Sequence, residues 1–340
     1  MQPIWKDYIV NLDEATGQSA ADAIDYVVAL MDSGTVLYTG RAVRRPGAAH
    51  IPVCLNDICR PYLVAPRPRM EDGAFTPYVL PWFRIDVGDE QEYDDVQYLP
   101  DWSYDYGRTG EEALLSAPIN GRVDPRQLLP VTVCQQAQVS FSLTYADGTT
   151  ETVTVQIAHA RDFSDDFSSD FANSEVRLGT GTAVLDLATR PGLAAVSVLG
   201  QTYAVVQPCH DYALMYRNAF GGWDNFLLEG AVVPADGYDR RTMTRAVDNV
   251  DPTTRARHNY LTEVTQRWTM RTGWLHDDEV ARLHHLTGST DVYLYDIATG
   301  DLVPVVLTSG EAVYTTYKTN GRKPGYYELT AERAQGRERR

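Results

Sequence analysis

The sequence has little lysine, little cysteine and no long apolar run, and each shortage excludes a class of protein. Only three of its 340 residues are lysine, and 46 acidic residues outweigh 30 basic ones, giving a formal net charge of −16. Proteins that bind a nucleic-acid duplex concentrate basic side chains to displace phosphate counterions, so we expect no sequence-specific nucleic-acid binding. No segment approaches the roughly 18 consecutive apolar residues of a bilayer span, so we expect no membrane insertion.

The cysteines are too few for a disulfide scaffold, which indicates free thiols in a reducing cytoplasm. The spacing of the first two fits no common zinc knuckle. Charged residues interrupt positions 1–14, so we do not expect this segment to serve as the apolar core of a secretory signal. The four cysteines of the chain are Cys54, Cys59, Cys134 and Cys209.

The periodicity of the chain is that of β-strands. Short β-branched and aromatic runs alternate with polar residues between turn residues, which predicts a mainly β protein. Hairpins are expected over residues 24–43 and 137–158, where the sequences Asp-Ser-Gly and Asp-Gly supply the turns. Because 340 residues exceed what one hydrophobic core usually organises, we predict two β-sandwich or β-barrel domains. They cover residues 1–160 and 174–340, with a linker at 161–173.

Residues 61–130 are predicted to leave the N-terminal domain as an acidic surface excursion rich in proline and aromatic residues. Residues 86–105 within it hold eight carboxylates and no basic residue. The aromatic rings between these carboxylates require burial in the same subunit or contact with a partner, and both alternatives stay open. The candidates for contact with a ligand or partner are Tyr93, Tyr98, Trp102, Tyr104 and Tyr106.

One α-helix is well specified in the C-terminal domain, over residues 277–287. His276 as the N-cap and Glu279 at the third helical position form a capping-box pattern, and Gly288 ends the helix. Strands are expected around it, among them residues 260–270, in which alternate side chains face a core. The C-terminal domain is therefore predicted to be a β-barrel or sandwich with a single flanking helix.

The sequence shows no catalytic signature, and we expect no enzyme and no cofactor. It has no Gly-Lys-Ser/Thr phosphate loop and no Gly-x-Ser-x-Gly nucleophile elbow. Adjacent His284 and His285 would diverge by about 100° on a helix, which disfavours a shared metal. Cys209 and His210 would point to opposite faces of a strand, which disfavours a thiolate pair.

Three blocks of the sequence resemble virion structural proteins of tailed phages and prophages of gut Bacteroidales. The first block is Tyr212–Gly230, which includes the run Phe-Gly-Gly-Trp-Asp at 220–224. The second extends from Trp268 through the predicted helix to the final strands, and the third is the N-terminal pair 41–47 and 55–59. Together they cover about half of the chain.

This resemblance implies a structural component of a phage tail, at the level of the distal tail or baseplate, with a tail-tube-like C-terminal fold. Such proteins assemble in the host cytoplasm into rings, most often of six copies, and contact neighbouring tail proteins in the virion. The alternative is a carbohydrate- or receptor-binding module that uses the aromatic loop at 93–106. For the tail interpretation, the candidates for contacts between subunits are Phe220, Gly221, Gly222, Trp223, Asp224, Trp268, Arg271 and Trp274. The competing interpretation places the tryptophans of this set in the core of one subunit.

Overall fold

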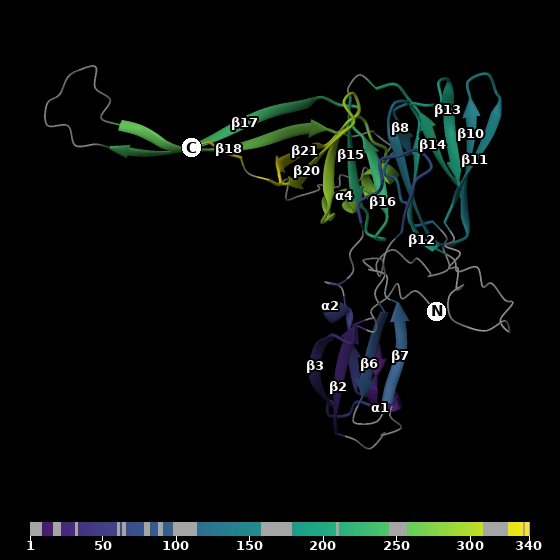
Figure 1. Ribbon diagram of the computed structural model, residues 1–340, viewed down its shortest axis with the longest axis vertical. Coiled ribbons are helices and arrows are strands. Elements are labelled where there is room, and N and C mark those ends of the chain that lie inside the picture. The colour runs from purple at the N-terminus through teal and green to yellow at the C-terminus, as the bar shows by residue number, and fades with distance from the viewer. Residues whose placement is uncertain are drawn as a thin grey trace, which may run out of the picture.

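The computed structural model shows a mainly β protein with short helices, as the alternation of the sequence predicts (Figure 1). The hydrophobic side chains form three large buried clusters, which define an N-terminal module, a sandwich module and a C-terminal module. The residues that the structure describes are 9–15, 22–30, 33–59, 62, 66–77, 82–87, 91–97, 114–157, 179–208, 211–244, 257–308, 326–335 and 337–339.

The N-terminal module contains a four-stranded antiparallel sheet in the order β3-β2-β6-β7. Its first two strands form the hairpin predicted over residues 24–43, and alternate side chains of β2 face a core with Leu12 and Phe83. A small sheet, β1 with β4, lies beside it. The elements are β1 Ile9–Asn11, α1 Leu12–Ala15, β2 Ala23–Leu30, β3 Val36–Val43, β4 Pro52–Cys54, α2 Asn56–Cys59, β6 Trp82–Val87 and β7 Gln91–Gln97.

The sandwich module has two sheets whose inner faces share one hydrophobic cluster. One sheet runs β11-β10-β13-β14-β8 and the other β5-β12-β9. Phe141 and Val196 from the first sheet and Val131 from the second are each fully buried in this cluster. The strands are β5 Phe75–Pro77, β8 Arg122–Val123, β9 Leu128–Gln136, β10 Gln138–Tyr145, β11 Thr150–Gln156, β12 Gly179–Asp186, β13 Leu193–Val198 and β14 Gln201–Val205.

The division of the cores differs from the two predicted domains. The predicted hairpin over residues 137–158 is present as β10 and β11, but β10 also pairs with β13, on the far side of the predicted linker. Strands from both sides of residue 160 therefore fill one core. The linker at 161–173 lies outside the described residues.

The predicted excursion at 61–130 is also wrong in its described parts, because they contribute strands to two cores. β6 lies between β2 and β7 in the N-terminal sheet, and β5 and β9 flank β12 in the sandwich. Leu129 and Val133 of β9 are fully buried. Proline and acidic residues are frequent in this stretch, so its composition alone did not indicate these β-strands.

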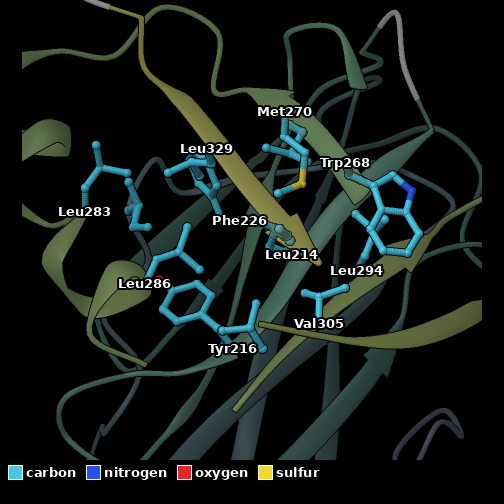
Figure 2. Close-up of a cluster of buried hydrophobic side chains, with 14 of the residues drawn as sticks. Leu214, Tyr216, Phe226, Trp268, Met270, Leu283, Leu286, Leu294, Val305 and Leu329 are labelled. Carbon is cyan, nitrogen blue, oxygen red and sulfur yellow. The ribbon is translucent and has the colours of Figure 1, made fainter. Parts of the chain in front are cut away.

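The C-terminal module has an eight-stranded sheet in the order β16-β15-β19-β20-β21-β18-β17, and β22 adds to β18. Helices α3 and α4 cover one face, where Leu283 and Leu286 pack with Tyr216, Trp268 and Met270 (Figure 2). Among the described residues, no pairing joins β16 to β17 to close a barrel. The elements are β15 Tyr212–Arg217, β16 Trp223–Leu227, β17 Val232–Thr244, β18 Arg257–Arg271, α3 Asp277–Ala281, α4 His284–Thr287, β19 Val292–Asp296, β20 Asp301–Leu307, β21 Glu328–Arg333 and β22 Arg337–Arg339.

The helix predicted over residues 277–287 forms as α3 and α4, two short helices in succession. The backbone N–H of His276 donates to the Glu279 carboxylate at 2.8 Å, which is the reciprocal half of a capping box. Val280 and Leu283 face the core. The sequence also predicts a strand over residues 312–317, and this segment lies outside the described residues.

Candidate assembly surface

The segment 220–224, predicted as a contact between subunits, is buried inside one chain. It follows β15 and leads into β16, where the C-terminal module meets the sandwich module. Phe220, Trp223 and Asp224 are each at most 4% exposed. Their burial comes from the same subunit, so this turn has no surface to offer a second copy.

Asn218 organises this turn through both ends of its side-chain amide. Its carbonyl oxygen accepts hydrogen bonds from the backbone N–H groups of Phe220, at 2.8 Å, and Gly222, at 3.0 Å. Its amide nitrogen donates to the Leu115 carbonyl at 2.8 Å and to the Asp224 carboxylate at 2.7 Å. One side chain therefore fixes the turn and ties it to the sandwich module.

Further contacts make residues 218–224 a joint between the modules. The Trp223 backbone N–H donates to the Thr132 hydroxyl at 2.8 Å, and its indole N–H donates to the Pro66 carbonyl at 3.1 Å. A Cβ added to Gly222 would lie 2.7 Å from the Leu115 carbonyl oxygen, so only glycine permits this approach. We call this set of contacts the module joint.

The remaining predicted contact residues divide between the core and the surface. Trp268 lies in the C-terminal core, as the competing interpretation expects. Arg271 is exposed and forms an ion pair with Glu328 at 3.5 Å. Trp274 is 61% exposed, and its ring meets Tyr326 edge-on with centroids 5.6 Å apart. Arg271 and Trp274 are therefore the members of the predicted set that a partner can reach.

The aromatic loop proposed for ligand or partner contact is mostly beyond the described part of the chain. Tyr93 lies on β7, the last strand in the N-terminal sheet order. Tyr98, Trp102, Tyr104 and Tyr106 fall outside the described residues. Their role stays a prediction.

The most conspicuous surface feature is a long two-stranded ribbon that projects from the C-terminal sheet (Figure 1). β17 and β18 pair over 13 register positions, from Val232↔Met270 to Thr244↔Arg257. β21 supports β18 only at Arg267–Arg271, and β22 only at residues 262–264. We call the part beyond β21, residues 236–244 and 257–266, the arm.

The arm has no buried side chain among those that the structure describes. Tyr238 and Tyr260 are more than half exposed, and Met243 is 44% exposed. A bulge between Arg241 and Thr242 leaves Tyr260 without a cross-strand partner. Within the described chain, β18 is the only strand that pairs with β17, so the outer edge of the arm keeps its backbone groups unpaired.

Among the described residues, the side chains that could bind a metal ion do not form a cluster, and the described buried cysteines are not activated as nucleophiles. No group of three or more His, Cys, Asp or Glu side chains there is arranged to hold a metal ion. Burial, and then the nearby Cys54, raise the pKa of Cys59 to about 12, and burial also raises the pKa of Cys134. Both thiols therefore stay protonated at neutral pH and are poor nucleophiles. Cys209 and His210 lie outside the described residues.

One of the two adjacent histidines supports the module joint. The rings of His284 and His285 do not diverge as the sequence predicts, because their centroids are 4.1 Å apart. His284 is the first residue of α4. His285 is buried, and its Nδ1 accepts a hydrogen bond from the Ala219 backbone N–H at 3.3 Å. Burial lowers the pKa of His284. The His285 ring also lies 5.0 Å from that of Phe220 between centroids, so His285 packs beside the turn and helps to hold it.

Sequence reasoning missed the arm because a strand in a sheet and a strand in a free ribbon share the same alternation. The lengths of β17 and β18, 13 and 15 residues, are the signal that distinguishes them. Ordinary strands have about five or six residues.

The chain matches no known family, no curated protein and no solved structure. No helix among the described residues is long and apolar enough to cross a membrane.

Proposed function

We propose that the chain is a non-enzymatic structural subunit of a phage tail, in the distal tail or baseplate, that assembles with copies of itself into a ring. Six copies are favoured, and other tail proteins bind the ring in the virion after assembly in the host cytoplasm. The observation that carries the proposal is the exposure of the arm, a long ribbon that has no buried side chain among those the structure describes.

A two-stranded ribbon alone in water is at best marginally stable, since it buries little apolar surface. The arm leaves Tyr238, Met243 and Tyr260 exposed, and no strand of the described chain pairs with its outer edge. Exposed apolar side chains and a free strand edge favour association with another chain. A subunit that completes its packing in an assembly has both features.

The resemblance to tail proteins supports the same proposal from the sequence. It includes Tyr212–Gly230 and the region that begins at Trp268, which here form β15, β16, the end of β18 and the helices beside them. The arm lies between these two blocks. The proposal therefore joins a core similar to tail proteins with a projecting element for contact.

The test is the mass of the purified chain in solution by light scattering, followed by negative-stain imaging. We expect a closed ring with a central channel. A matched variant replaces residues 240–262 with Asn-Gly, so that Asp239 and Glu263, which pair in the sheet, close a two-residue hairpin. This variant should keep its circular-dichroism spectrum and remain monomeric.

Two results would contradict the proposal. One is a wild-type chain that stays monomeric at every concentration tested. The other is a shortened variant that assembles as well as the wild type, because the arm would then have no part in assembly.

A further inference from the structure

The segment 240–262 of the sequence is basic, although the protein is strongly acidic. Residues 240–262 contain five Arg and two Asp, net +3, so the rest of the chain carries −19. Of the charged residues in segment 240–262, the structure describes Arg240, Arg241 and Arg257, which lie on the arm. Residues 9–97 are among the acidic parts, with 14 acidic and seven basic residues.

The two faces of the arm differ in how their arginines are neutralised. Successive residues of a strand point to opposite faces, so Arg240 lies on the face of Tyr238 and Arg241 on the face of Asp239. Arg241 forms an ion pair with Glu263 at 3.4 Å. Arg240 instead lies over the Tyr238 ring, 5.6 Å from its centroid, and forms no ion pair with any residue that the structure describes.

The sheet register places two more arginine positions across β18 from β17. Thr262 pairs with Arg240 on one side and with Arg339 of β22 on the other. Val264 pairs in the same way with Tyr238 and with Arg337. Tyr238, Arg240, Arg337 and Arg339 therefore occupy two neighbouring rows of the sheet, and we call these four positions the basic rows.

We propose that the basic rows dock on an acidic surface of a second copy of this chain. This inference rests on the proposed self-assembly and specifies its chemistry. Opposite charges steer the encounter and set the orientation, while the exposed tyrosine supplies apolar contact area. The occupant is a second copy because residues 240–262 carry +3 and the rest of the chain −19.

The deciding experiment uses zero-length carbodiimide cross-linking between amines and carboxylates. The arm contains no lysine, so Arg240→Lys keeps the charge and supplies a single reactive amine there. Equal amounts of ¹⁴N- and ¹⁵N-labelled protein are mixed, assembled and cross-linked. Mass spectrometry should find mixed-isotope peptides that join position 240 to an Asp or Glu of another copy.

Arg241→Lys is the matched control, one residue away on the opposite face. Its amine lies beside Glu263 of the same chain, so its cross-links should be intramolecular and carry one isotope. Mixed-isotope links from position 241 and none from position 240 would overturn the proposal.

A second measurement separates this inference from the proposed function. Arg240→Gln should raise the concentration needed for half-assembly by roughly three- to tenfold, and Arg241→Gln should change it little. Added salt should weaken wild-type assembly and reduce the difference between Arg240→Gln and wild type. A ring that forms equally well in Arg240→Gln and at high salt would overturn this inference and leave the proposed function standing.

Two other outcomes are also decisive. A wild-type chain that never assembles would overturn the inference together with the proposed function. Fluorescence anisotropy with a mixed-sequence DNA duplex tests whether the basic rows bind nucleic acid instead of an acidic protein surface. Duplex binding that Arg240→Gln abolishes, without any mixed-isotope cross-link, would assign the basic rows to nucleic acid.

Discussion

Trp223 provides a direct test of whether residues 218–224 form a joint inside one chain or a contact between subunits. Its side chain is 1% exposed, and its ring lies 6.0 Å from that of Tyr293 between centroids. Truncating a buried tryptophan to alanine costs about 3–5 kcal/mol of unfolding free energy. That range includes about 1 kcal/mol for the indole N–H bond to the Pro66 carbonyl, which loses its donor.

Trp274→Ala is the control, because it removes the same side chain from a site that is 61% exposed. We expect a change within about 1 kcal/mol there, since little surface is uncovered. Both variants are measured by urea unfolding, followed by circular dichroism and by the fluorescence of the remaining tryptophans. The unfolding midpoint of Trp223→Ala should fall well below those of wild type and Trp274→Ala.

The opposite result would refute the reasoning. If Trp223→Ala has the same unfolding midpoint as Trp274→Ala but fails to assemble, then the turn forms a contact between subunits and not a joint inside one chain. Circular dichroism and tryptophan fluorescence are compared for separate unfolding transitions of Trp223→Ala. If two transitions are found, the one at the lower urea concentration should belong to the sandwich and C-terminal modules, because the joint connects them.

Three further predictions concern single residues. Gly222→Ala should lower stability by about 1–3 kcal/mol, because the new methyl group meets a backbone carbonyl at 2.7 Å, whereas Gly237→Ala on the arm, where the nearest atom is 3.5 Å away, should be nearly neutral in the same melting assay. The pKa of Asp13 is lowered, chiefly because a backbone N–H donates to its carboxylate, so the charged form stabilises the fold. Asp13→Asn should therefore lower the melting temperature by a constant amount above the ordinary pKa of 3.8, and the gap from wild type should close as the pH falls below it. Iodoacetamide at pH 8 should label exposed Cys54 in the native chain and reach Cys59 only after unfolding, and equal labelling of both would contradict the burial of Cys59.

The local elements could be predicted from the sequence because period and turn chemistry are local properties. The hairpin of β10 and β11 follows from an Asp-Gly turn between alternating runs, and the capping interaction of Glu279 with His276 follows from residue spacing. The arrangement of the elements could not be predicted in the same way. Pairing of β10 with β13 depends on which edges meet in space, and no residue spacing encodes that choice.

The candidate contact residues show the same limit. A tryptophan beside two glycines predicts a turn with a large ring near it, which suits a core and an interface equally. Burial distinguishes Trp223 from Trp274, and burial is decided by segments far away in the chain. The arm was missed because alternation alone does not reveal whether a sheet continues on either side.

The module joint also constrains the order of folding. It brings together residues far apart in sequence: the residue numbers of Pro66 and Trp223 differ by 157, and those of Thr132 and Trp223 by 91. Contacts of such long range slow folding, because chain entropy is lost before they form. Synthesis from the N-terminus produces Pro66 and Thr132 first, so β16 emerges from the ribosome when its docking site has already been made. A circular permutant that reverses this order would have to fold β16 without that template and would expose its apolar strands for longer.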